Sequence, residues 1–292
     1  MTYGSYPFSN YNLCFVDDLS ADVIDTASLS ICSNRLLYPE EILDPIDEIT
    51  RKIIHALASQ WLGVNIVNKE SADMWIIVAC SYFMTDYFLE DLFGRNDFRY
   101  RQRVAADRLF NLDVHRPSLY DLGPALACDP SELDFMILKA PLVLFMLHQR
   151  LSAKAATKFG VNRIIWRLCL NAKTGDLQNS AVSTPYFLRV SEKAAHGKLD
   201  AFFNQWVYGA GCPHFLVTQR FNKKKLIVEM LIKQIQAERT NQPHSREPQN
   251  FQREVKEHKN NIIGSPIQPL FTVSRLVILR RVYFNNRVSR DR

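Results

Sequence analysis

The stretch over residues 49–62 constrains the fold more than any other part of this sequence, because its apolar residues recur with a helical period. These residues are Ile49, Ile53, Leu57 and Trp61. Apolar residues at every fourth position predict an amphipathic helix. His55 and Ser59 also lie four residues apart. A helix therefore places these two side chains on one face, one turn apart.

This spacing matches the zinc-binding helix of metalloproteases, where H-E-x-x-H supplies two ligands and a general base. The first histidine is present as His55, but Ala56 stands at the position of the base and Ser59 at the second ligand. In gluzincin aminopeptidases a glutamate after 18 intervening residues is the third ligand, and the matching residue here is Val78. Taken alone, His55 is typical of a core or groove histidine that donates to a backbone carbonyl.

The neighbouring segments make the resemblance to gluzincin aminopeptidases more specific. Gln60-Trp61-Leu62-Gly63 resembles their Q-W-F-G segment, residues 75–79 resemble W-L-N-E-G, and residues 139–144 resemble the Y-x-K-G-A helix start. The tyrosine of that last segment stabilises the oxyanion, and its position here is Ile137, which has no donor to offer. The resemblance therefore implies a thermolysin-like fold with no catalytic residues, no bound metal and no cofactor.

A longer set of segments is similar to a narrower family, the catalytically inactive gluzincin-like subunits of the general transcription factor TFIID. These segments are residues 6–18, 54–61, 138–144, 202–213 and 219–225. The resemblance implies a non-catalytic nuclear scaffold for RNA polymerase II preinitiation complex assembly. Its implied partners are other TFIID subunits and promoter DNA or chromatin, with no membrane and no small-molecule substrate.

The fold class expected from these segments is α+β, mainly α: a degenerate gluzincin aminopeptidase domain, followed by the start of a β-sandwich. We place the first domain at residues 1–208, the partial sandwich at 209–272 and a basic tail unlike the family at 273–292. The glycines and proline within 209–213 interrupt the helical pattern before the sandwich. Because the family has further domains on both sides, we expect this chain to be a truncated form.

The remaining elements follow from periodicity and capping residues. We expect helices over residues 49–62, 71–92, 133–147 and 199–207, and one that opens at Thr184-Pro185. We expect strands within 6–18 and over 214–221 and 225–235, and a surface loop over 237–250. Pro141 predicts either a kink in its helix or a later helix start.

Composition places the chain among globular proteins, with 292 residues, 47% hydrophobic and 23% charged. The amino terminus has neither a basic nor an apolar signal region, so we expect no secretory signal. The six cysteines are far apart and form no C-x-x-C pair, which is typical of reduced and mostly buried thiols in the cytosol or nucleus.

The charge is uneven along the chain. Residues 1–50 hold nine acidic residues against Arg35, and residues 275–292 hold six arginines against Asp291. Candidate DNA-phosphate contacts are Lys223, Lys224 and Lys225, for which a solvated turn is the alternative interpretation.

Two other functions compete with the scaffold. The first is an active zinc aminopeptidase with ligands from elsewhere, or a nucleophilic pair of His148 and Cys169. The second is a helical interaction module outside TFIID.

Overall fold

The computed structural model describes residues 3–113, 116–126, 129, 131–155, 160–211, 214–222, 227–235 and 276–279. The chain divides into two compact units, Met1–Ala210 and Gly211–Arg292. The division lies beside the boundary at residues 208 and 209 that the sequence analysis expects.

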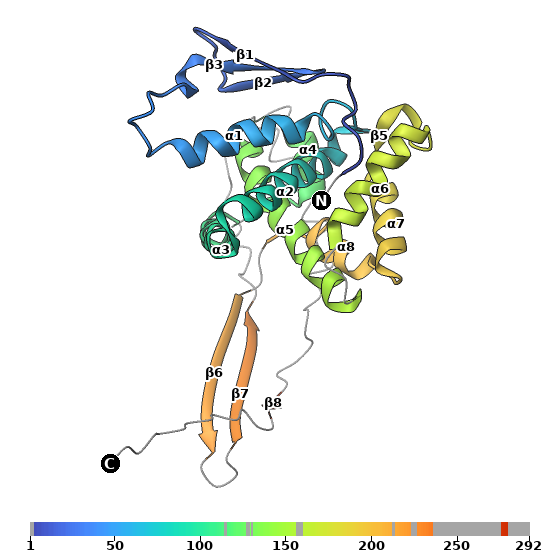
Figure 1. Cartoon of the computed structure of the whole chain (residues 1–292). Coiled ribbons are helices and arrows are strands. Elements are labelled where there is room, and N and C mark those ends of the chain that lie inside the picture. Colours follow the sequence, from blue (N-terminus) through green and yellow to red (C-terminus); the bar gives the residue numbers. More distant parts are fainter. Residues whose placement is uncertain are drawn as a thin grey trace, which may run out of the picture. The chain divides into compact units, whose positions relative to one another are not determined.

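Unit 1 begins with a three-stranded sheet of β1 (Asn12–Val16), β2 (Val23–Thr26) and β3 (Leu29–Ser33). The strand order is β1-β3-β2, with β1 parallel and β2 antiparallel to β3. The sheet lies along α1 (Ile46–Ser59), which β2 contacts (Figure 1). The strand expected within residues 6–18 is β1, and the helix expected over 49–62 is α1, which begins and ends three residues earlier than expected.

Helix α2 (Met74–Phe93) forms the centre of unit 1 and contacts α1, α3, α4 and α5 (Figure 1). It has buried residues on all sides, as expected of a helix enclosed by other elements. A short 3₁₀ turn, η2 (Ser71–Asp73), leads into it, and it ends at Gly94, whose φ of 92° suits a residue without a side chain. This confirms the helix expected over residues 71–92.

The other helices of unit 1 surround α2. They are α3 (Arg95–Leu112), α4 (Leu119–Ala125), α5 (Glu132–Ala155), α6 (Gly160–Thr174), α7 (Thr184–Ala195) and α8 (Asp200–Trp206). Helix α5 continues through Pro141, so its start is near the capping segment rather than at Pro141. The short elements are η1 (Asn34–Leu36), η3 (Gln178–Ser180) and the paired strands β4 (Val67–Asn68) and β5 (Ala181–Val182).

A buried polar network joins the start of α2 to the start of α7. The Asp73 carboxylate accepts hydrogen bonds from both the backbone N–H and the hydroxyl of Thr184, each at 2.7 Å. The indole N–H of Trp75 donates to the same hydroxyl oxygen at 3.0 Å. Because all three residues are buried, each of these polar groups depends on its partners in the folded state.

One sequence expectation about burial is wrong. Leu57, expected on the apolar face of α1, is 37% exposed, whereas Ala56, Ala58 and Ser59 are buried. The buried face of α1 therefore consists of small residues, which allow close approach of neighbouring elements. Cys14 is exposed, although Cys32 and Cys80 are buried as expected.

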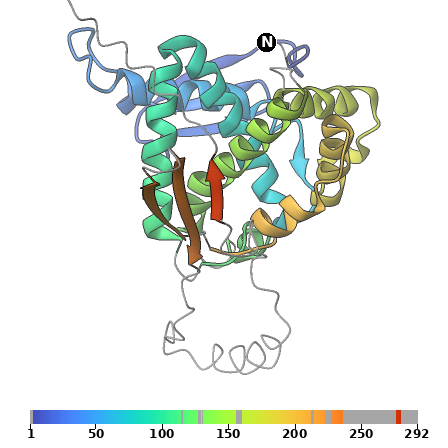
Figure 2. The same ribbon diagram turned by 90° about the horizontal axis from the view of Figure 1, so that it is seen from below.

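Unit 2 contains an antiparallel sheet of β6 (His214–Asn222), β7 (Ile227–Ile235) and β8 (Leu276–Leu279), in that order (Figure 2). Strands β6 and β7 confirm the two strands expected over residues 214–221 and 225–235. The loop expected over 237–250 and most of the basic tail lie outside the described residues. No helix in the described part of the chain has the length and apolar character that crossing a membrane requires.

Candidate functional site

The His55 side chain packs between α1 and α2. Its ring stacks on the ring of Tyr82 with 3.8 Å between centroids and 24° between planes. Its Nδ1 lies 3.4 Å from the Thr85 hydroxyl oxygen, and that hydroxyl donates its own hydrogen to the Ser81 carbonyl at 2.9 Å. Since Thr85 has one hydroxyl hydrogen, Nδ1 is the donor in its contact with Thr85. The expected groove histidine is present, but its acceptor is a hydroxyl and not a backbone carbonyl.

His55 is neutral at physiological pH. Burial, together with the nearby charge of Arg51, lowers the pKa of its imidazole from 6.5 to about 4. Arg51 also forms an ion pair with Asp86 at 3.0 Å, and burial raises the pKa of that carboxyl. Desolvation disfavours the charged form of a buried imidazole. The ring of His55 is therefore neutral and is held by packing rather than by charge.

The Ser59 hydroxyl is engaged within its own helix. It donates to the His55 carbonyl at 2.9 Å, the hydrogen bond that a serine often makes to the preceding turn. Asp25 of β2 lies near this hydroxyl, and burial raises the pKa of its carboxyl while the hydroxyls of Ser30 and Ser59 lower it. Ser59 therefore supports the contact between α1 and the sheet.

The two other positions that match the base and the third ligand of an aminopeptidase carry alkyl groups. Ala56 and Val78 are both buried. On α2, Val78 precedes Tyr82 and Thr85 by four and seven residues, so all three lie on the face that carries the His55 contacts. A catalytic zinc requires three protein ligands with nitrogen, sulfur or oxygen donors. One stacked imidazole, one engaged hydroxyl and two alkyl side chains do not fit this metal.

Metal ligands are not gathered elsewhere in the described residues either. Within them, no group of three or more His, Cys, Asp or Glu side chains is placed to hold a metal ion.

Ile137 lies on α5 and is partly buried. Two residues later on the same helix is Lys139, whose charge no sequence pattern explains. The Lys139 ammonium is buried and forms an ion pair with Asp113 at 2.7 Å. The same ammonium lies 5.5 Å from the centroid of the Phe135 ring. Sequence reasoning missed this pair because Asp113 lies 26 residues away and no local pattern links the two.

Gln60 is a second residue whose role only the structure reveals. Its buried side chain donates from Nε2 to the Thr26 carbonyl at 3.1 Å. Its Oε1 accepts from the Ser28 N–H at 3.1 Å and from the Tyr6 hydroxyl at 3.2 Å. The aminopeptidase-like segment that contains Gln60 thus connects α1 to the sheet and to the amino-terminal segment.

The structure gives His148 and Cys169 no nucleophilic arrangement. The His148 Nδ1 accepts from the Val161 N–H at 3.3 Å, near the amino-terminal end of α6. Burial raises the pKa of the Cys169 thiol to about 12, so the thiol is protonated at neutral pH. A thiolate is the reactive form of cysteine.

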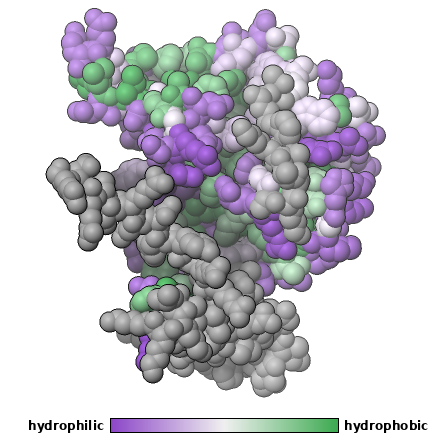
Figure 3. Space-filling view, turned by 60° about the horizontal axis from the view of Figure 1, so that its bottom comes forward, coloured by the Kyte–Doolittle hydropathy of each residue, from purple (hydrophilic) through white to green (hydrophobic). Residues whose placement is uncertain are grey.

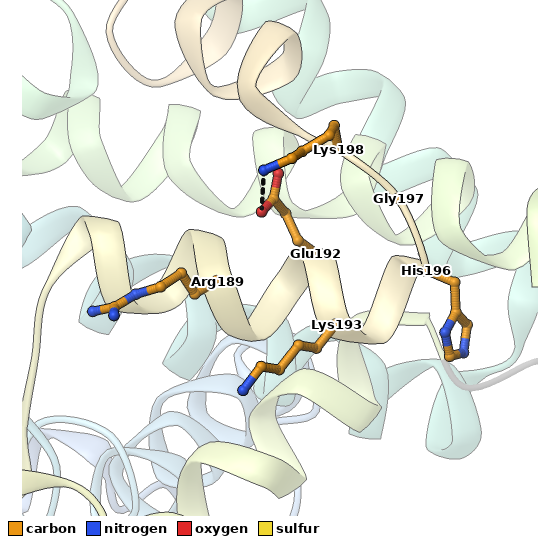
Figure 4. Close-up of a pocket in the computed structure, with 6 residues that line it drawn as sticks. All are labelled: Arg189, Glu192, Lys193, His196, Gly197 and Lys198. Atoms are coloured by element: carbon orange, nitrogen blue, oxygen red, sulfur yellow. Dashed lines mark ion pairs between the residues drawn. The ribbon is translucent and has the colours of Figure 1, made fainter.

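A basic groove of about 520 Å³ lies at the carboxyl-terminal end of α7 (Figure 4). Arg189, Lys193 and His196 line it, and Lys198 pairs with Glu192 across 3.5 Å. No sequence motif marks these residues. The candidate phosphate contacts expected from the sequence, Lys223, Lys224 and Lys225, lie outside the described residues.

Comparison with known sequences gives close relatives. The chain is 44% identical over 260 residues to transcription initiation factor TFIID subunit 2 of Schizosaccharomyces pombe, which covers 89% of this chain and 22% of the relative. It is 34% identical over 240 residues to the protein of that name from Saccharomyces cerevisiae, which covers 81% of this chain and 17% of the relative. The family model described as TAF2 Ig-like domain matches residues 210–268.

Comparison with solved structures finds aminopeptidases. Aminopeptidase A of Legionella pneumophila superposes with a TM-score of 0.56 and 19% identity, over 76% of this chain and 24% of that chain. At this identity the likeness shows the fold alone. It confirms the expected fold class, a mainly helical aminopeptidase-like domain. The chain spans about a fifth of the length of the two yeast relatives.

Proposed function

The chain is homologous to a segment of TFIID subunit 2, and on this premise we propose that it acts as a non-catalytic scaffold in TFIID. In this role it supports assembly of the RNA polymerase II preinitiation complex in the nucleus, through contacts with other TFIID subunits. The observation that carries the proposal is the 44% identity over 260 residues to the Schizosaccharomyces pombe subunit.

The side chains around His55 support the non-catalytic part of the proposal. We take His55, Ala56, Ser59, Val78 and Ile137 as the remains of the ligand, base and oxyanion positions of an aminopeptidase. Alkyl groups cannot bind zinc or accept a proton from zinc-bound water. Stacking on Tyr82 also engages the one imidazole that is left.

In this proposal the second unit is part of an Ig-like domain. Residues 209–272 form part of an Ig-like sandwich, supported by the match over residues 210–268 and by the antiparallel sheet of β6, β7 and β8. Such a sandwich normally consists of two packed sheets.

Promoter DNA is the proposed nucleic-acid partner. Lys223, Lys224 and Lys225 supply positive charge for three phosphate contacts. Each phosphate contact contributes a slope of about −0.9 to log affinity against log salt, so three contacts predict about −3. Fluorescence anisotropy with a duplex of arbitrary sequence, at several salt concentrations, measures this slope.

The scaffold role is tested by affinity purification of a tagged full-length protein from nuclear extract, with mass spectrometry of what is retained. We expect TFIID subunits to be retained in stoichiometric amounts. Retention of none of them, from an extract in which an antibody against another subunit recovers the complex, would contradict the proposal.

A further inference from the structure

The segment before α1 exposes large apolar side chains to an unusual degree. Five of them within ten residues are 47–67% exposed. They are Leu37, Tyr38, Ile42, Leu43 and Ile46, here called the 37–46 ledge. In Figure 1 this segment links β3 to α1 at the left edge of the unit, and Figure 3 shows green, hydrophobic residues at that edge beside purple, hydrophilic ones. Clustered apolar exposure of this kind marks a surface that binds another molecule.

Local structure keeps these side chains displayed. Pro39 and Pro45 restrict the backbone, and two turns close the segment. The Ile42 N–H donates to the Pro39 carbonyl at 3.0 Å, and the Ile46 N–H donates to the Leu43 carbonyl at 3.1 Å. The apolar groups are therefore fixed outside the core by the backbone that carries them.

Acidic residues dominate the charges around the ledge, since residues 35–47 hold four carboxylates against Arg35. Glu40, Glu41 and Asp44 are exposed, and none of them forms an ion pair with any residue that the structure describes. Arg35 is exposed at the amino-terminal end of the ledge, and Lys52 of α1 pairs with Glu48 and Asp22. The ledge thus presents an apolar centre with an acidic rim.

We propose that the 37–46 ledge is a docking surface for a segment of another protein, one that carries lysine or arginine around apolar anchor residues. Apolar anchors cover the leucine and isoleucine side chains, and the basic residues meet the three unpaired carboxylates. Charge complementarity of this kind selects the partner and speeds its association. A nucleic acid is excluded as the occupant because its phosphates would face this acidic rim.

The experiment is site-specific photo-crosslinking in cells that produce the full-length protein, with p-benzoylphenylalanine at Tyr38 or at Tyr100. Tyr100 is the matched control, because it is the same residue type and 68% exposed against 51% for Tyr38, but its neighbours on α3 are arginines. Mass spectrometry of the crosslinked peptides identifies the occupant. We expect position 38, and not position 100, to capture a peptide from a different protein that is rich in lysine or arginine and contains aliphatic residues.

Reversal of the charges on the acidic rim is the second part of the experiment. We expect the triple substitution Glu40→Lys, Glu41→Lys and Asp44→Lys to reduce the crosslink at position 38 by about tenfold, because rim charges govern association. These residues are exposed, so the fold tolerates the change. Capture of an acidic peptide, of another part of the same polypeptide or of nothing at position 38 would overturn the proposal, as would an unchanged yield in the triple variant.

The crosslinking experiment can fail while the scaffold role holds, and the reverse is also true. The occupant can be a TFIID subunit or a different protein, and the peptide chemistry decides the inference in either case. Purification of TFIID subunits with the tagged protein decides only the scaffold role.

Discussion

Acidification should destabilise the protein through His55. The pKa of its imidazole is lowered from 6.5 to about 4 by burial and by Arg51, so the unfolded chain binds a proton more readily than the folded protein between these values. Stability therefore falls as the pH drops below 6.5. The loss is about 2 kcal/mol at pH 5 and about 3 kcal/mol once the pH is below 4, at 1.36 kcal/mol per pKa unit.

The assay is urea denaturation at pH 7 and pH 5 for the wild type and for His55→Gln. Other groups also titrate in this range, notably His148, whose pKa burial lowers, and Asp86, whose pKa burial raises. The difference between the two proteins isolates His55, because the other groups are common to both. We expect the wild type to lose about 2 kcal/mol more than the variant between the two pH values.

An NMR titration of the His55 ring measures the same quantity directly. Removing the nearby charge with Arg51→Gln should move the pKa of His55 upward, although burial remains the larger cause. A wild-type ring that titrates near 6.5 would refute the reasoning. It would mean that the imidazole is in water and that its packing against Tyr82 is wrong.

Substitutions at three sites in the interior give further predictions. Lys139→Ala leaves Asp113 buried without its 2.7 Å partner and should cost about 3–5 kcal/mol in chemical denaturation, whereas Lys139→Met combined with Asp113→Leu should be close to neutral. Gln60→Ala removes three hydrogen bonds from α1 and should lower the unfolding free energy by about 2 kcal/mol or more, measured in the same way. Gly123→Ala would place a Cβ 1.9 Å from the Ser71 carbonyl oxygen and should cost about 3 kcal/mol or more, seen as a lower Tm.

The sequence predicts the elements that carry strong patterns. The apolar α2 segment, the proline start of α7 and the strands β6 and β7 are all where periodicity and capping place them. Helix α6 was missed although its buried Val161, Ile164, Ile165 and Leu168 have helical spacing, so a signal was present. Helix α3 has no such apolar pattern, because Leu109 is its one buried residue and its other positions are mostly polar.

The contacts around His55 were not predictable from the sequence. The positions proposed as degenerate are predictions from motif spacing, because H-x-x-x-S and its flanks are local in the sequence. The stack of Tyr82 on His55 and the contacts of Gln60 with β2 depend on tertiary packing. The periodicity of α1 pointed to Leu57 as buried, whereas the small residues opposite it are the buried ones. Local spacing specifies a helix but not which of its faces a neighbouring element covers.

The central claim is that this aminopeptidase-like domain does not bind zinc, and metal analysis tests it most directly. The purified protein is incubated with zinc, dialysed and measured by inductively coupled plasma mass spectrometry, and a parallel sample is assayed with aminoacyl p-nitroanilides. The account predicts substoichiometric zinc and no hydrolysis above the background rate. One tightly held zinc per chain, with hydrolysis that a chelator abolishes and added zinc restores, would contradict it.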